Sequence, residues 1–224
     1  PTMVLAYLVT VPFDKGRYAI GWWFRRLGVA MAKVNPYWRF RRTGLRVADP
    51  RRPYVVVSNH ESFADILLIS HLPFEMKWLS KVEILKIPLI GWMMRMAGDI
   101  PIKRGFGPSA VEAMERCRAS LRNRVSVIFF PEGTRSVDGN MLPFKDGAFR
   151  LAIEAGVPIL PLAVAGTRTA LPKHDWRFNP ARAIVEVLPP IETSGLTLED
   201  LPQLKERVRA TIQAARDALR AQLA

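Results

Sequence analysis

The pattern of apolar and polar residues along the chain predicts an α/β protein. Short runs such as 54–58 and 125–130 are almost entirely apolar, and longer segments with a helical period separate them. A strand that is apolar on both faces is typical of a sheet covered by helices on both sides. We therefore expect a mixed, largely parallel sheet flanked by helices. The strands are predicted at 39–47, 54–58, 75–79, 99–103, 125–130, 159–165 and 183–188. The helices are predicted at 63–71, 87–97, 108–123, 147–155 and 198–223.

The N-terminal residues follow a different pattern and predict a helical segment that associates with a membrane. Residues 1–13 are apolar but would form a helix of only about 20 Å, short of the roughly 30 Å hydrocarbon core. We interpret them as a truncated transmembrane helix or a re-entrant anchor. The apolar stripe of residues 15–34 has 4-3-4-3 spacing, at Ile20, Phe24, Leu27, Met31 and Val34.

The cations of this helix, Arg25, Arg26 and Lys33, are predicted to lie off the stripe, while Trp22 and Trp23 widen its apolar face. Such a basic amphipathic helix is typical of a membrane-surface anchor. The alternative is that the stripe merely packs on the domain. Because Asn35-Pro36 breaks the pattern, we predict an anchor at 1–36 and a single domain at 37–224.

The distribution of charge supports a polyanionic partner. The chain carries a net charge of +13. Residues 1–52 hold eleven basic residues and two acidic ones, a net charge of +9. Nucleic acid and an anionic membrane both suit such a segment, but the accompanying aromatic and aliphatic residues favour the membrane. The sequence also lacks helix-turn-helix, zinc-finger and RNP-type signatures, so no nucleic-acid partner is expected.

The single cysteine, Cys117, excludes an intramolecular disulfide and any cluster of cysteines around a metal. Its helical spacing predicts packing in the core. A reducing, cytoplasm-facing location fits this usage.

The first candidate for chemistry is the turn Ser58-Asn59-His60-Glu61-Ser62-Phe63-Ala64-Asp65, which follows an apolar strand. Asp65 lies in the first turn of the next helix, where its carboxylate can reach one imidazole nitrogen of His60. The other nitrogen is then free to take a proton from a substrate hydroxyl. The alternative is that Ser62 or Asp65 simply caps the helix. Position 64 is alanine, so the H-E-x-x-H zinc motif is absent, and neither a G-x-S-x-G elbow nor a Walker loop occurs.

Three further stretches carry charge near predicted strand ends. Lys103 and Arg104 end one strand and suit a phosphate, although a solvated strand end is the alternative. In Phe129-Phe130-Pro131-Glu132-Gly133-Thr134-Arg135 a buried strand breaks at Pro131 and Gly133, which places polar residues at the carboxyl end of the sheet. Lys145 adds a cation at the start of a helix, and 157–162 then enters the next strand. The Gly105-Phe106-Gly107-Pro108 stretch matches a dinucleotide fingerprint only weakly, so no cofactor is expected.

These four stretches, in this order across 59–162, resemble the four motifs of the glycerolipid acyltransferase family. The branch of greatest similarity is the 1-acylglycerol-3-phosphate acyltransferases. By that resemblance His60 is the general base, Asp65 its partner, and Asn59 and Ser62 support the turn. The resemblance also implies a substrate-binding set of Lys103, Arg104, Glu132, Gly133, Thr134, Arg135 and Lys145. The chain departs from the family pattern at Glu61, often Gln, and at Pro101, often Phe.

The reaction implied is acyl transfer from acyl-CoA or acyl carrier protein to the free hydroxyl of 1-acylglycerol-3-phosphate, giving phosphatidic acid. It needs neither a metal nor a cofactor. The implied partners are lysophosphatidic acid, the donor and a phospholipid surface, and the implied location is the cytoplasmic face of the cell membrane. Two alternatives stay open. One is an acyltransferase for glycerol-3-phosphate or another lysolipid, and the other is a non-catalytic lipid-binding module.

Overall fold

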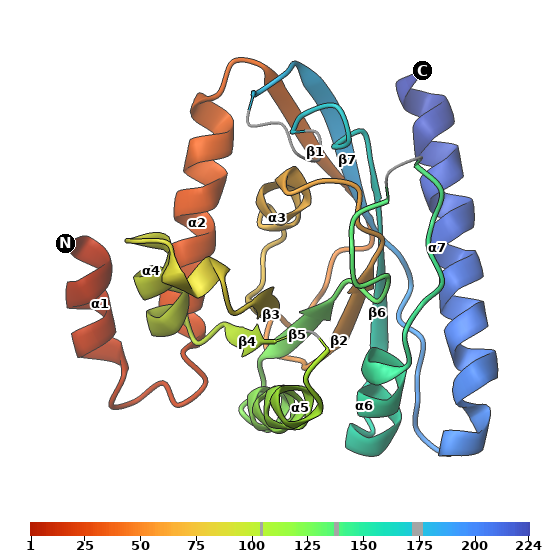
Figure 1. The fold of residues 1–224 in the computed structure, drawn as a ribbon, viewed down its shortest axis with the longest axis horizontal. Helices are drawn as coiled ribbons and strands as arrows, with labels where there is room; N and C mark the ends of the chain where they lie inside the picture. The colour runs from red at the N-terminus through yellow and green to blue at the C-terminus, as the bar shows by residue number, and fades with distance from the viewer. Residues whose placement is uncertain (104, 137–138, 172–176) are drawn as a thin grey trace.

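The computed structural model describes residues 1–103, 105–136, 139–171 and 177–224. Within them the chain forms a seven-stranded sheet in the order β1-β7-β6-β2-β5-β3-β4 (Figure 1). Neighbouring strands are parallel except β6 and β7, which are antiparallel. The strands are β1 (Trp38–Gly44), β2 (Val55–Ser58), β3 (Met76–Lys81), β4 (Ile100–Ile102), β5 (Ser126–Phe129), β6 (Ile159–Ala165) and β7 (Ala181–Val187). The predicted mixed, largely parallel sheet is confirmed.

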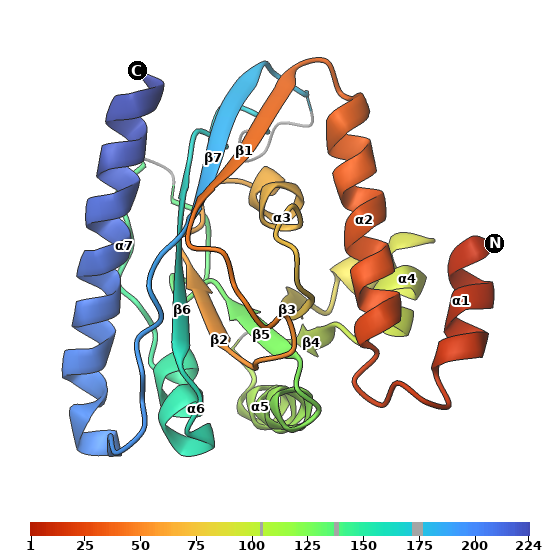
Figure 2. The same ribbon diagram turned by 180° about the vertical axis from the view of Figure 1, so that it is seen from behind.

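Helices cover both faces of this sheet (Figures 1 and 2). They are α1 (Thr2–Thr10), α2 (Tyr18–Val34), α3 (Ala64–Ile69), α4 (Ile90–Ala97), α5 (Gly107–Arg122), α6 (Gly147–Ala155) and α7 (Leu201–Leu223). Val55 and Val57 face the core shared with α5, α6 and α7, whereas Val56 faces the core shared with α3. All three valines are fully buried, as expected for a strand that is apolar on both faces. Cys117 packs in the first of these cores, as predicted.

Two helices, α4 and α7, begin three residues later than predicted, each for a local reason. Before α4 the chain forms a 3₁₀ turn at Ile84–Lys86, and Leu89 then adopts a positive φ of 63°, so the helix starts at Ile90. Before α7 a second 3₁₀ turn spans Leu198–Asp200, and Thr197 caps its N-terminal end with a capping box.

The N-terminal helices α1 and α2 gather with α4 at one end of the sheet (Figures 1 and 2). Of the predicted apolar stripe, Ile20 is buried against the domain, whereas Met31 and Val34 are 69% and 79% exposed. Arg25, predicted to lie off the stripe, is instead buried. The predicted stripe is therefore not a single face in the fold, since α2 packs on the domain partly through Ile20 and Arg25 and exposes Met31 and Val34. Among the described residues, none of the helices combines the length and apolar character needed to cross a bilayer.

Arg25 is buried because it joins a cluster of four buried charges with Glu75, Lys77 and Asp99. Its guanidinium pairs with the Asp99 carboxylate, and its Nε lies 3.6 Å from Glu75 Oε2. Lys77 Nζ lies 3.0 Å from Glu75 Oε1 and also donates to the carbonyl of Ala97 at 2.7 Å. Two cations and two carboxylates thus balance one another where α2 meets β3, which is how buried charges are tolerated.

Candidate active site

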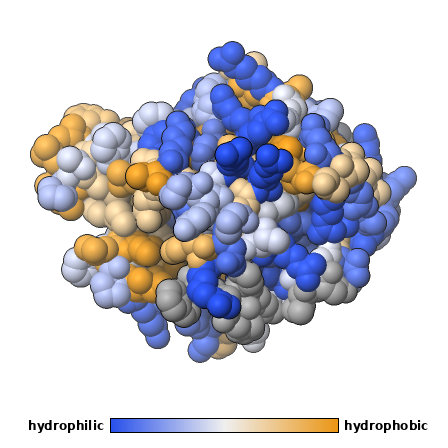
Figure 3. Space-filling model, turned by 90° about the horizontal axis from the view of Figure 1, so that it is seen from above, coloured by the Kyte–Doolittle hydropathy of each residue, from blue (hydrophilic) through white to orange (hydrophobic). Residues whose placement is uncertain are grey.

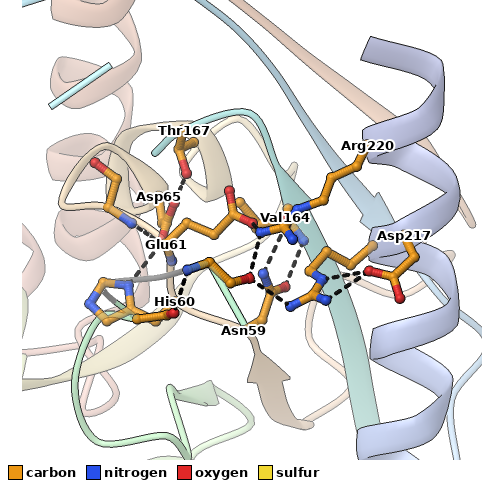
Figure 4. Close-up of polar contacts among 12 residues, drawn as sticks. Asn59, His60, Glu61, Asp65, Val164, Thr167, Asp217 and Arg220 are labelled. Carbon is orange, nitrogen blue, oxygen red and sulfur yellow. Dashed lines mark hydrogen bonds and ion pairs between the residues drawn. The ribbon is translucent and has the colours of Figure 1, made fainter. Parts of the chain in front are cut away.

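The stretches that carry His60 and Glu132 come together where β2 and β5 end. The two strands are parallel neighbours, with Val57 paired with Phe129, so the turn after β2 and the loop after β5 leave the same edge of the sheet. That edge is where open α/β sheets place their ligands. Figure 4 shows the polar contacts that hold the turn around His60.

His60 and Asp65 form the predicted pair. His60 Nδ1 lies 2.7 Å from Asp65 Oδ2, and the same oxygen accepts hydrogen bonds from the backbone N–H groups of Glu61 at 2.8 Å and Ser62 at 3.0 Å. An oxygen that accepts from two backbone donors is held as an acceptor for the imidazole as well. His60 Nδ1 therefore carries the proton, and its Nε2 presents a lone pair.

Thr167 completes this arrangement and was missed by the sequence analysis. Its hydroxyl donates to Asp65 Oδ1, so both oxygens of the fully buried carboxylate have donors. Thr167 follows β6, which lies next to β2 in the sheet. The available signal was a polar residue just beyond a buried strand that ends at the same edge.

Asn59 and Ser62 fasten the turn to the rest of the domain. The Asn59 amide donates to the carbonyl of Val164 and accepts from its N–H, both at 2.8 Å. Ser62 Oγ donates to the carbonyl of Leu171 at 2.9 Å and accepts from the N–H of Ala64 at 3.2 Å. The capping alternative and the catalytic pair are thus compatible, because Ser62 binds the first residue of α3 while Asp65 binds His60.

The imidazole of His60 stacks on Phe130, with ring centroids 4.0 Å apart and planes 17° from parallel. Its side chain is 14% exposed. Within the described residues its Nε2 makes no hydrogen bond. The ring is therefore fixed by Asp65 on one nitrogen and by Phe130 on one face, and the nitrogen with the lone pair is the one left for a substrate.

Glu132 binds backbone on both sides of the site. Its Oε1 accepts from the N–H of His60 and its Oε2 from the N–H of Leu142, both at 2.8 Å. Burial raises the pKa of this carboxyl, and the two backbone donors oppose that shift. The resemblance assigns Glu132 to substrate binding. In the fold its carboxylate also connects the His60 turn to the loop before α6.

Lys145 lies over Gly133, as the space around the glycine shows. Gly133 has a φ of +73°, and a Cβ added there would lie 2.8 Å from Lys145 Nζ. A side chain at this position would therefore be strained and would collide with the cation. Thr134 is exposed and Arg135 is half-buried on the same loop.

Of the remaining predicted cations, Lys103 is among the described residues. Lys103 lies in the turn before α5, where its Nζ sits 5.3 Å from the centre of the Phe106 ring and its N–H donates to Ser109 Oγ. Arg104 lies outside the described residues. Across the described ranges, no three His, Cys, Asp or Glu side chains form a group that could hold a metal ion.

Comparisons with known proteins agree with the geometry. Residues 39–165 match the family model described as Acyltransferase. The chain is 43% identical over 162 residues to 1-acyl-sn-glycerol-3-phosphate acyltransferase alpha of Homo sapiens, covering 71% of this chain and 57% of that protein. It is 37% identical over 171 residues to the chloroplastic 1-acyl-sn-glycerol-3-phosphate acyltransferase BAT2 of Brassica napus, covering 76% of this chain and 49% of that protein. The chain thus spans about half the length of the curated relatives it matches.

A solved structure shows the same fold. The crystal structure of the 1-acyl-sn-glycerophosphate acyltransferase PlsC from Thermotoga maritima superposes with a TM-score of 0.70 at 28% identity, covering 88% of this chain and 77% of that one. The family model spans more than half of the chain, and its range contains both His60 and Asp65. The chain therefore belongs to the acyltransferase family.

Proposed function

We propose that this protein transfers an acyl group from a thioester to the free hydroxyl of 1-acylglycerol-3-phosphate, giving phosphatidic acid. The observation that carries the proposal is the His60–Asp65–Thr167 arrangement at the edge of the sheet. It orients one histidine as a base and supplies no protein nucleophile, which suits a reaction whose substrate is itself an alcohol. The names of the relatives support the choice of acceptor.

The proposed reaction proceeds in two steps. His60 Nε2 takes the proton of the acceptor hydroxyl as its oxygen attacks the thioester carbonyl, and the Asp65 carboxylate stabilises the imidazolium that forms. The tetrahedral intermediate then collapses, the carbon–sulfur bond breaks, and the imidazolium returns its proton to the departing thiolate of coenzyme A or acyl carrier protein. The histidine ends as it began, and neither a metal nor a cofactor is required.

The acceptor phosphate is proposed to bind the cations beside the base. Among the residues that the structure describes, the candidates are Lys145, which lies over Gly133, and Arg135 on the same loop as Gly133. Lys103 and Arg104 are the candidates from the second motif. A forked guanidinium and a compact ammonium together suit a phosphate monoester.

Residues 1–36 are proposed to hold the protein at the cytoplasmic face of the membrane, where a lysolipid acceptor resides. Leu5, Leu8 and Val9 of α1 are each more than 60% exposed. Leu89 and Trp92, just before and within α4, are exposed as well. Figure 3 shows hydrophobic surface gathered at this end of the molecule. An exposed apolar surface of this kind is typical of an interfacial anchor.

The catalytic proposal is tested by acyl transfer from radiolabelled acyl-CoA, with acyl carrier protein as a parallel donor, to lysophosphatidic acid in mixed micelles. We expect His60→Ala to lose at least about a hundredfold in kcat, as loss of a general base predicts. His71→Ala is the matched control, because His71 lies just beyond α3 and its Nδ1 contacts the carbonyls of Leu67 and Leu68 in that helix. Full activity of His60→Ala would refute the mechanism.

The acceptor and the membrane proposals have tests of their own. Glycerol-3-phosphate and phosphate-free lysolipids, assayed beside lysophosphatidic acid, identify the acceptor, and Lys145→Ala should raise KM only for those that carry a phosphate monoester. A wild type that binds lysolipid without turnover would support the non-catalytic alternative.

For the membrane proposal, the double variant Leu5→Asp/Leu8→Asp should reduce flotation of the protein with phosphatidylglycerol vesicles. The control is Leu198→Asp, an exposed leucine just before α7.

A further inference from the structure

Two arginines of the C-terminal helix point toward the proposed site, and one of them, Arg220, contacts the turn that carries His60. Arg220 Nη2 donates to Glu61 Oε1 at 2.6 Å and to the carbonyl of Gly139 at 2.9 Å. Arg216, one turn earlier, also points its guanidinium at the carbonyl of Gly139, at 3.4 Å. Figure 4 shows Arg220 extending from α7 toward Glu61, a residue 159 positions earlier in the chain.

Glu61 is a buried carboxylate directly beside the proposed base. Its side chain is 5% exposed, and burial raises its pKa while Arg220 opposes that shift. Removing the partner of a buried charge is costly, so the group would protonate or turn toward solvent. The Glu61 backbone N–H donates to Asp65 Oδ2, so a movement of this residue would reach the pair directly.

Gly139 connects Arg220 to the second half of the site. Its N–H donates to Ser136 Oγ at 2.9 Å, and the Ser136 N–H points to the carbonyl of His60 at 3.4 Å. A few residues later, the N–H of Leu142 donates to Glu132. Arg220 thus contacts, with one guanidinium, both the turn that carries the base and the carbonyl of Gly139.

We propose that Arg220 is a positioning residue, which acts through Glu61 and Gly139 to keep His60 in its active geometry. This inference rests on the proposed function, in which His60 is the base. Arg220 lies beyond the 39–165 range of the family model. The α7 helix itself is held by other residues, since Leu204, Val208, Ile212 and Leu219 are buried on its apolar face. Loss of Arg220 is therefore expected to disturb the site without undocking the helix.

The test compares Arg220→Ala, Arg220→Lys, Glu61→Gln and the double variant Glu61→Gln/Arg220→Ala in the full chain. Arg220→Ala should lower kcat about 10- to 100-fold with little change in KM, since small misplacements of a catalytic group cost this much. Arg220→Lys should retain part of the activity that Arg220→Ala loses. The double variant should regain at least about fivefold over Arg220→Ala, because a neutral amide does not require a cation. Arg207→Ala, an exposed arginine on the same helix, should match wild type.

A second readout does not depend on turnover. The chain has three histidines, so the ring resonances of His60 can be assigned by comparison with His60→Ala. They should move in Arg220→Ala, return toward wild type in the double variant and stay in place in Arg207→Ala.

Unmoved His60 resonances, or a kcat of Arg220→Ala within about twofold of wild type, would overturn the positioning role. So would a loss of activity that parallels a loss of thermal stability and is not rescued by Glu61→Gln. A wild type without activity would refute the proposed function, while the resonances would still decide whether Arg220 positions His60.

Discussion

Asp65→Asn separates the charge of the carboxylate from its geometry. The amide oxygen of the introduced side chain could occupy the position of Oδ2 and accept the same three N–H groups, from His60, Glu61 and Ser62. The amide nitrogen would then face Thr167, whose hydroxyl can accept in place of donating. The fold and the orientation of the imidazole are thus expected to survive, and the negative charge beside the imidazolium is lost.

The magnitude follows from that lost charge. A hydrogen bond to a charged group contributes about 1.5–3 kcal/mol, which is roughly a 10- to 150-fold change in rate if it acts only in the transition state. The pair is largely enclosed, since Asp65 is fully buried, so the charge is poorly screened. We therefore expect kcat to fall toward the upper end of that range, by about 100-fold.

The assay measures kcat for acyl transfer to lysophosphatidic acid together with the thermal midpoint of each variant. Thr167→Val is the matched comparison, because it keeps the charge and removes one donor to Oδ1. It should cost about 1–3 kcal/mol of stability for the unsatisfied oxygen, but less than about tenfold in kcat. A folded Asp65→Asn whose kcat lies within about threefold of wild type would show that the carboxylate contributes orientation alone.

Three further predictions concern the framework around the site. Asn59→Ala leaves the N–H and the carbonyl of Val164 without their partner, so the free energy of unfolding should fall by about 1–3 kcal/mol for each group, measured by urea denaturation. Lys77→Met removes a buried cation that neutralises Glu75 and should destabilise the fold by about 3–5 kcal/mol, with a corresponding drop in melting temperature. Burial raises the pKa of the Cys117 thiol to about 12, so maleimide at pH 8 should label this residue only after denaturation; rapid labelling of the folded protein would contradict its burial.

The sheet could be predicted because its strands carry their own signal. The runs 54–58 and 125–130 are apolar throughout, and a strand buried on both faces is the simplest structure that such a run can form. The strand Ile159–Ala165 and the helix Gly147–Ala155 have the predicted bounds. Boundaries differ where backbone geometry intervenes, as at Leu89, whose positive φ no hydrophobic period could indicate.

The pairing of His60 with Asp65 could be predicted because it is local. Five positions and one turn separate the two residues, so the spacing alone limits how their side chains can meet. Thr167 and Arg220 lie 102 and 159 positions from their partners, Asp65 and Glu61. Only the topology of the sheet and the docking of α7 bring these residues to the turn, and neither can be derived from residue spacing.

The N-terminal cations show why a count of charges cannot assign them to a membrane. Arg25 is neutralised inside the domain by Asp99 and Glu75, and Arg26 donates to the carbonyls of Ser70 and Leu72 at the end of α3. These guanidinium groups fasten α2 to residues just before β3 and β4 and just after α3, and they lie on its domain side.

What α2 presents outward is largely apolar, with Met31 and Val34 among its most exposed side chains. The attraction of this segment for a bilayer is thus expected to come more from apolar burial than from these two charges. Arg25→Gln should accordingly lower the melting temperature while leaving vesicle flotation unchanged for the protein that stays folded. A parallel loss of flotation in the folded fraction would return Arg25 to the membrane-binding surface.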